Sequence, residues 1–256
     1  MAHVYGRAGA SPHDTADRFM HRALVLIILV GTMTYLLVKH VADIGNLGVG
    51  GVALLGVAAV SFSVLAKGIG TLEGTARRYY GGARGESRVG RLLARLPEEY
   101  HVFNGVRFYA GDIDHVVVGP TGIFVVETKV YAGTISSRAG QLTRNGQPLE
   151  RDLVRQATAE TTCVKDLLGV AGTHHVHPIL VFVKARVRLH ETLDGVRVVP
   201  VSLLVSSIVR RRSSLHPLQI QEYARVLAQA TGTRQRVADR RVTPHPGESL
   251  SGGSPD

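Results

Sequence analysis

The chain begins with two long apolar stretches and continues with the mixed apolar and polar pattern of a folded domain. Residues 23–38 and 45–66 carry no charged side chain. The second stretch is long enough to cross a bilayer core of about 30 Å as a helix, and the first is long enough when its flanks, Lys39 and His40, snorkel outward. This pattern predicts a transmembrane helical hairpin, with helices at about 23–40 and 45–66. A buried helical pair in a soluble protein is the alternative interpretation.

Charges around the two stretches predict their orientation. Arg18 and Arg22 precede the first stretch, and Lys67, Arg77 and Arg78 follow the second. Because cytoplasmic flanks carry the excess of Lys and Arg, we expect both termini and the soluble domain to be cytoplasmic in a multi-pass protein of the cell membrane.

The remaining residues divide by composition. Residues 1–22 and 233–256 are polar or poor in large apolar groups, so we predict a disordered cytoplasmic N-terminus and a disordered tail. Residues 67–83 are rich in glycine and predict a juxtamembrane linker. Residues 84–232 form the predicted soluble domain, of α/β class. Its expected elements are a helix at 84–96, a hairpin of 112–118 with 123–129, a second hairpin within 134–149, a helix at 151–169, strands at 178–183 and 196–201, and a helix at 217–230.

Composition narrows the class of partner. The chain has 30 Lys and Arg residues against 20 Asp and Glu, which favours an anionic partner such as nucleic acid or an acidic membrane surface. A single cysteine, Cys163, excludes an internal disulfide framework and any metal site built from several cysteines.

The first hairpin carries the candidate chemistry. Glu127 and Lys129 are two residues apart on a strand, so they point to the same face. If the loop is Pro120 and Thr121 alone, counting outward from the turn places Asp114 opposite Glu127. A type I turn with Gly122 in the left-handed region would shift the register by one residue and turn Glu127 away from Asp114. The sequence leaves this register open.

These three side chains fit a phosphodiesterase site. Two converging carboxylates are oxygen ligands for Mg²⁺ or Mn²⁺, which keep some water and bind substrate phosphates. A neighbouring lysine can orient or deprotonate the attacking water and stabilise charge on a phosphate. The alternative is an ordinary solvated face of a hairpin.

Residues 85–156 resemble the nuclease-related domain (NERD) family of the PD-(D/E)xK superfamily, whose core is restriction-endonuclease-like. The resemblance rests on the order of several short stretches. They are Gly85-Glu86 opening a helix with Arg88, Asp112-Ile-Asp-His, Gly122 to Lys129 with its Glu-Thr-Lys, Tyr131-x-Gly-x-Ile, and Gln156 in a helix. One departure is that Leu153-Val-Arg precedes Gln156, where family members often have Asn-Pro shortly before the glutamine.

The resemblance implies a role for each matching residue. Asp114, Glu127 and Glu86 are the implied metal ligands, and Asp112, on the same face as Asp114, is a less favoured substitute. The implied catalytic residues are Lys129, Glu127, Asp114 and Gln156, and the expected nucleic-acid contacts are Arg88, Lys129 and Arg155.

The resulting expectation is a membrane-anchored, Mg²⁺- or Mn²⁺-dependent nuclease that acts on nucleic acid, with DNA favoured over RNA. The alternative is a catalytically inactive module that tethers nucleic acid or a protein to the membrane. A third hypothesis is a structural membrane protein whose hairpin oligomerises through Gly48, Gly51 and Gly56.

Overall fold

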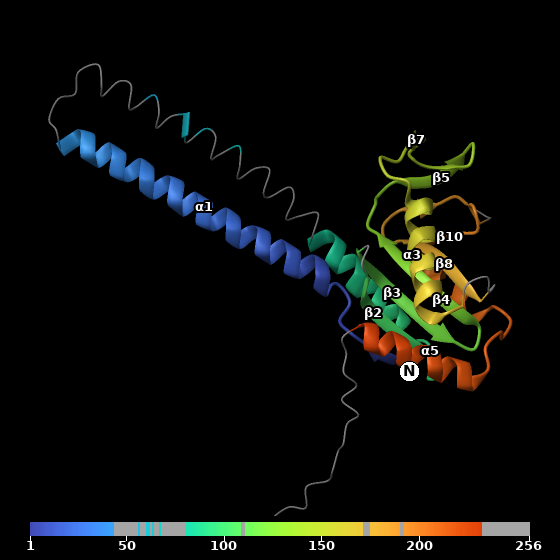
Figure 1. Ribbon diagram of the computed structural model, residues 1–256. Coiled ribbons are helices and arrows are strands. Elements are labelled where there is room, and N and C mark those ends of the chain that lie inside the picture. Colours follow the sequence, from blue (N-terminus) through green and yellow to red (C-terminus); the bar gives the residue numbers. More distant parts are fainter. Residues whose placement is uncertain are drawn as a thin grey trace, which may run out of the picture.

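The structure is a computed structural model that describes residues 1–43, 80–108, 111–170, 175–189 and 192–231, with five isolated positions between 56 and 67. It is a mixed α/β protein (Figure 1). The strands are β1 (His3–Tyr5), β2 (His101–Phe108), β3 (Gly111–Gly119), β4 (Gly122–Lys129), β5 (Thr134–Arg138), β6 (Gln141–Arg144), β7 (Gln147–Pro148), β8 (Val176–Phe182), β9 (Arg186–Val187) and β10 (Arg197–Pro200). The helices are α1 (Ala10–Asp43), a helix described over 80–93, α3 (Leu153–Leu168), the 3₁₀ helix η1 (Val201–Leu203), α4 (Leu204–Val209) and α5 (Pro217–Ala230).

The strands form two sheets. The main sheet has six strands in the order β1-β2-β3-β4-β8-β10. Its centre is the antiparallel meander β2-β3-β4, and the parallel strands β8 and β10 extend it beyond β4. A small four-stranded sheet, β7-β6-β5-β9, lies beyond the ends of β4 and β8.

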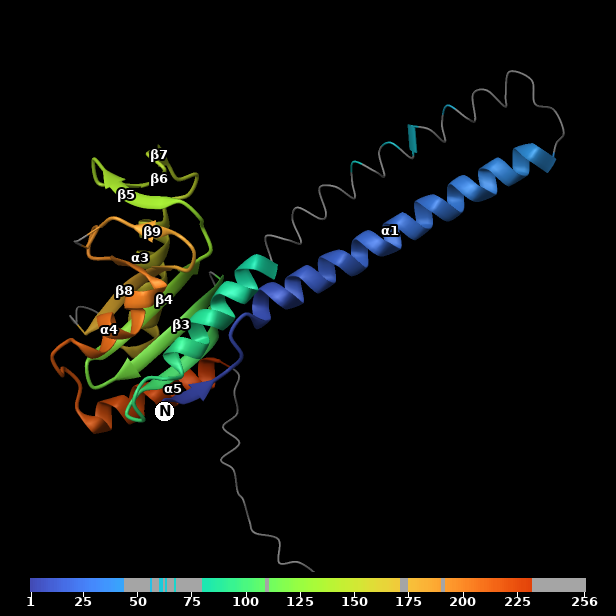
Figure 2. The ribbon, with the colours of Figure 1, turned by 180° about the vertical axis from the view of Figure 1, so that it is seen from behind.

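Helices cover both faces of the main sheet. The helix at 80–93 and α4 pack on one face through an apolar cluster that includes Val89, Leu93 and Phe124. On the other face α5 and α3 pack over Val116 and Val125, and α3 also packs on β8 and the small sheet. Two opposite views show α3 and the helix at 80–93 on opposite sides of the sheet (Figures 1 and 2). The domain is therefore a sheet between two helical layers.

The β3–β4 hairpin has the register of the two-residue loop. Gly119 pairs with Gly122, and the pairs continue to His115 with Val126. The two-residue loop is therefore confirmed, and extending its register by one residue places Asp114 opposite Glu127. The hydroxyl groups of Tyr100 and Thr121 lie 2.9 Å apart in a buried hydrogen bond that holds the turn.

The N-terminus differs from the prediction of a disordered segment over 1–22. His3–Tyr5 forms β1, which pairs in parallel with β2, and α1 follows from Ala10. Further contacts hold this segment, because Ser87 Oγ donates to the carbonyl of Ala8 at 3.2 Å. Backbone pairing and docking on the helix at 80–93 order a segment whose composition alone predicts disorder.

One described helix is long and apolar enough to span a membrane. This is Ala23–His40 within α1, with a mean hydropathy of 1.9 and no part of it buried in the protein. Membrane spans and N-terminal signal sequences share this length and composition. The predicted second span, 45–66, lies outside the described residues apart from four scattered positions. Most of the predicted linker at 67–83 and all of the tail at 233–256 also lie outside them.

Candidate active site

A hydrogen-bonded cluster joins the end of β4 to α3. The Lys129 ammonium forms an ion pair with Glu127 Oε1 and donates to Gln156 Oε1 at 3.2 Å. The Gln156 amide donates to Glu127 Oε1 at 2.8 Å. Glu127 is 4% exposed, so its carboxylate is held almost entirely by protein groups. The structure thus brings together three of the residues that the sequence predicted.

Asp114 reaches the same cluster from β3. Its Oδ2 accepts a hydrogen bond from the backbone N–H of Thr128 at 2.8 Å. This bond lies just beyond the backbone pair of His115 with Val126, so the side chain continues the pairing of the two strands. Asp114 and Glu127 therefore sit opposite each other, as the two-residue loop requires.

Glu86 approaches from the helix at 80–93, on the other side of the sheet. Gly85 allows this approach, because a Cβ there would lie 2.2 Å from Cγ2 of Val130, the residue after Lys129. The N-terminal segment also holds Glu86, since the backbone of Gly9 forms a hydrogen bond with its carboxylate. Glu127 is close enough for its charge to disfavour the charged form of Glu86 and so to raise the pKa of Glu86.

Glu160 is a fourth carboxylate of the cluster that the sequence analysis missed. Gln156 Nε2 donates to its Oε1 at 2.7 Å, and its Oε2 is buried with no hydrogen-bond partner. The spacing of Gln156 and Glu160 carries the missed signal, because residues i and i+4 lie on one face of a helix. Once Gln156 is placed at the site, Glu160 follows on the next turn.

The cluster carries an excess of negative charge. Burial, and then repulsion from Glu127, raises the pKa of Glu86 to about 7 and that of Glu160 to about 8. Burial also raises the pKa of Asp114, and the charges of Glu127 and Glu86 raise it further. Burial alone would lower the pKa of Lys129, but the carboxylates, with Glu127 foremost, raise it above its usual value. The lysine is therefore cationic at neutral pH.

The carboxylates could hold a divalent cation, although they are not preformed as a metal cage. Within the part of the chain that the structure describes, no three His, Cys, Asp or Glu side chains make a ready metal-binding group. The donor chemistry nevertheless suits Mg²⁺ or Mn²⁺, because Asp114, Glu127 and Glu86 offer only oxygen. Burial and the charge of Glu127 raise the pKa of Glu86 and of Asp114, and a bound cation would favour their charged forms.

Other predicted residues lie around the cluster. Asp112 is exposed and lines a cavity of about 250 Å³ between β3 and α3, together with Gln156 and Glu160. Arg155 is exposed and lies beside Gln156 on α3. Arg88 is also exposed, but it lies two residues after Glu86, about 200° around the helix, so it points away from the cluster. The structure does not bring Arg88 to the site.

Comparison with known proteins gives one family and one relative. Residues 81–183 match the family model described as "Nuclease-related domain". This range includes all six residues of the cluster, which are Glu86, Asp114, Glu127, Lys129, Gln156 and Glu160. An uncharacterized protein of Bacillus anthracis is 45% identical over 71 residues, which cover 25% of this chain and 34% of that protein. No solved structure matches the chain significantly.

Proposed function

Residues 81–183 form a nuclease-related domain of the PD-(D/E)xK kind, and from this premise we propose that the chain is a membrane-anchored, metal-dependent nuclease. It hydrolyses phosphodiester bonds of nucleic acid, with DNA favoured over RNA. The observation that carries the proposal is the contact of Lys129 with Glu127 and Gln156, with Asp114 on the opposite strand.

Three carboxylates are the proposed ligands of Mg²⁺ or Mn²⁺: Asp114, Glu127 and Glu86. The bound ion supplies Lewis-acid stabilisation of the negative charge that develops on the scissile phosphate. The electrostatics of the cluster support this assignment, because burial and the charge of Glu127 raise the pKa of Glu86 and of Asp114, and a cation bound there would offset both effects.

The side chains have complementary tasks in the hydrolysis. A water oxygen attacks phosphorus and gives up one proton, the bond from phosphorus to the leaving oxygen breaks, and the leaving oxygen takes up a proton, so that one water is divided between the two products. Lys129 is protonated, so it acts as a fixed cation that donates hydrogen bonds to the charged phosphate oxygens. Gln156 holds Glu127 and Lys129 in register through both ends of its amide. Glu160 in turn accepts from Gln156 and so orients that amide.

The surrounding architecture supports the finer assignments. The hairpin β3–β4, followed by α3 and the parallel strand β8, suits a restriction-endonuclease-like core. The apolar segment Ala23–His40 supports a membrane anchor, and we retain the second span at 45–66 and the cytoplasmic orientation as part of the proposal.

One observation favours the alternative of an inactive module that binds nucleic acid or protein. Lys129 and Gln156 both occupy Glu127 Oε1, so a metal ion would have to share this carboxylate or displace them. In that case the exposed arginines would bind an anionic partner without chemistry.

The test is cleavage by the purified full-length protein in detergent. Labelled single- and double-stranded DNA and RNA are incubated with Mg²⁺, Mn²⁺ or EDTA. We expect metal-dependent cutting by the parent and by Lys165→Met, which removes a lysine elsewhere on α3. We expect a loss of about 100-fold or more in Lys129→Met, because one preorganised electrostatic contact contributes about that much. Salt-sensitive binding without cleavage by the parent would instead support the inactive module.

A further inference from the structure

Positive charge is concentrated around the small sheet. The described parts of 131–155 and 184–197 contain eight Lys and Arg residues but only three Asp and Glu residues. In the rest of the described domain from residue 80 onward, eleven cationic residues are nearly balanced by nine acidic ones. The net positive charge of the domain therefore lies mainly on these two segments, which contain the small sheet and the start of α3.

Strand pairing places three of these arginines on one face of the small sheet. Ile135 and Leu142 point toward α3 and are buried there. Arg186 pairs with Thr134, and Arg138 pairs with Gln141, so both lie on the opposite face from Ile135 and Leu142. Arg188 is two residues beyond Arg186 and follows the same alternation. We call Arg138, Arg186 and Arg188 the small-sheet platform.

The platform is open to a partner. All three side chains are exposed, and none forms an ion pair with any other residue that the structure describes. Arginine presents planar donors that match a phosphate in two simultaneous hydrogen bonds. A repeated anion, rather than an apolar ligand, therefore fits this face.

The platform is joined directly to the candidate active site. Lys129 pairs with Phe182 at the ends of β4 and β8, and both strands continue into the small sheet. Backbone bonds hold this junction, because Val183 N donates to Lys129 O at 2.9 Å and Arg186 N to Gly133 O at 2.8 Å. Arg186 is four residues beyond Phe182, which limits its Cα to about 14 Å from that of Phe182. Phe182 is one strand spacing of about 5 Å from Lys129, so Arg186 lies within about 19 Å of Lys129. About five or six phosphates of one strand of a duplex cover that distance.

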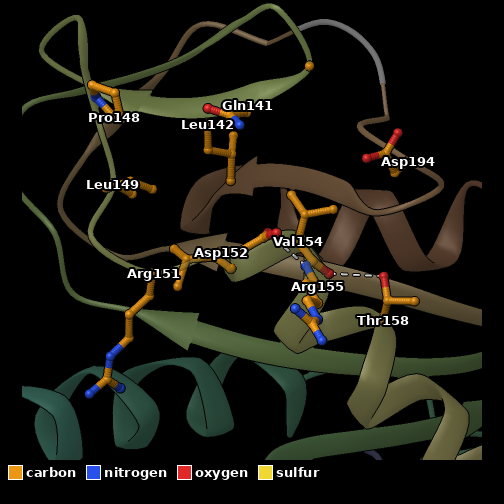
Figure 3. Close-up of a pocket in the computed structure, with 12 residues that line it drawn as sticks. Gln141, Leu142, Pro148, Leu149, Arg151, Asp152, Val154, Arg155, Thr158 and Asp194 are labelled. Carbon is orange, nitrogen blue, oxygen red and sulfur yellow. Dashed lines mark hydrogen bonds between the residues drawn. The ribbon is translucent and has the colours of Figure 1, made fainter.

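Two further arginines, Arg151 and Arg155, lie at the start of α3, on the side of the small sheet that faces this helix. A cavity of about 400 Å³ separates the Gln141–Leu142 hairpin from the first turn of α3 (Figure 3). Arg151 and Arg155 line it, and both side chains extend away from the hairpin. Asp152 caps the helix by accepting from Arg155 N, so the cavity is not itself a simple anion site.

From these observations we infer that the small-sheet platform binds the phosphodiester backbone of the substrate next to the cleavage site. The inference rests on the proposed nuclease function and assigns the substrate-holding surface to Arg138, Arg186 and Arg188. Contacts to phosphates do not depend on the base sequence, so the platform contributes affinity and fixes the position of the nucleic acid without sequence preference.

The test measures binding without chemistry. The full-length protein in detergent and EDTA is titrated with labelled 20-base-pair duplexes of DNA and of RNA over a range of salt concentrations. The triple variant Arg138→Gln, Arg186→Gln, Arg188→Gln is compared with Arg95→Gln, Arg210→Gln, Arg225→Gln, which removes the same charge from exposed positions elsewhere. For DNA, we expect the platform variant to bind about 10- to 100-fold more weakly near 0.1 M salt and to lose about 2 to 3 from the slope of log K against log salt. The control should stay within about threefold.

The outcomes separate this inference from the nuclease proposal. Equal weakening of the two triple variants overturns the platform, and so does a parent that binds neither duplex. Platform-dependent binding by a parent that cuts nothing supports the platform and contradicts the nuclease. Cleavage in Mg²⁺ with an unchanged KM in the platform variant contradicts the platform alone. Loss of pelleting with anionic phospholipid vesicles, with duplex binding unchanged, assigns the surface to lipid and overturns the inference.

Discussion

Gly9 links the N-terminal segment to the candidate active site, and adding one methyl group there tests that link. Gly9 has φ +76°, and a Cβ would lie 2.5 Å from the carbonyl oxygen of Ala83 and 2.9 Å from Ser87 Oγ. Both atoms belong to the helix at 80–93. Because no real Cβ approaches an oxygen so closely, Gly9→Ala must push the segment away from this helix. Glu86 then loses its backbone hydrogen bond from Gly9.

The size of the effect follows from two contributions. The left-handed backbone costs an alanine about 1–2 kcal/mol. Loss of a hydrogen bond to a charged group adds about 1.5–3 kcal/mol. Gly105→Ala is the matched control, because Gly105 has φ +62° and a Cβ there would meet nothing within 4 Å. Gly105→Ala should therefore show only the cost of placing an alanine in the left-handed backbone conformation.

The assay combines stability with metal dependence. Gly9→Ala should be less stable to urea than Gly105→Ala by about 1.5–3 kcal/mol. It should also raise the Mg²⁺ concentration for half-maximal cleavage by about tenfold, because Glu86 is no longer held in place. Equal behaviour of the two variants in both measurements would refute the coupling between the N-terminal segment and Glu86.

Two buried groups make stability depend on pH in opposite directions. Burial lowers the pKa of His115 to about 3. The contribution of His115 to the free energy of unfolding is therefore complete above about pH 6.5, the pKa of a histidine in the unfolded chain, and is lost as pH falls toward 3. Urea unfolding should show a loss of about 2 kcal/mol between pH 7 and pH 5 that His115→Gln does not share, and equal losses would contradict this. Burial and Glu127 raise the pKa of Glu160 to about 8, so its contribution is present below pH 4.5 and is lost as pH rises through 8. In EDTA, Glu160→Gln should exceed the parent in stability by about 1–3 kcal/mol at pH 9 and match it at pH 4, whereas a less stable variant at pH 9 would show that the carboxyl is not desolvated.

Strong periodicity made much of the fold predictable. The final helix at 217–230 has the predicted bounds, and Pro217 at its first position explains why its start was readable. The two strands of the first hairpin agree with prediction to within a residue at each end. Two candidate registers remained because Pro-Thr-Gly suits either loop, and tertiary contacts at the turn, such as Tyr100 with Thr121, are not visible in the local sequence.

Strands β2 and β1 could not be predicted, because the sequence around them lacks the pattern typical of strands. Strand β2 contains Asn104 and Gly105, which interrupt the alternation typical of strands. Asn104 is tolerated in a buried position because its Oδ1 accepts a hydrogen bond at 2.7 Å from Nδ1 of His115, its partner on the neighbouring strand β3. Strand β1 has three residues in a polar segment and depends on β2 for its pairing.

The candidate site was predictable where its residues lie on one strand or match the family. Glu127 and Lys129 follow from strand alternation, and Gln156 follows from the resemblance. Glu160 follows from Gln156 by helical spacing but was missed, whereas the contact of Gly9 with Glu86 depends on the docked N-terminus. The direction of Arg88 followed from helix geometry, since Glu86 is half-buried and Arg88, two residues later, is exposed on the other side of the helix.

The central claim is that Asp114 holds the metal ion that hydrolysis requires. Its most direct test is single-turnover cleavage at saturating Mg²⁺ by the parent, Asp114→Asn and Asp112→Asn. Both substitutions remove one charge from the same face of β3, but only Asp114 lies opposite Glu127. We predict that Asp114→Asn slows cleavage by about 100-fold or more and that Asp112→Asn slows it by less than about tenfold. Equal losses, or a larger loss in Asp112→Asn, would contradict the assignment.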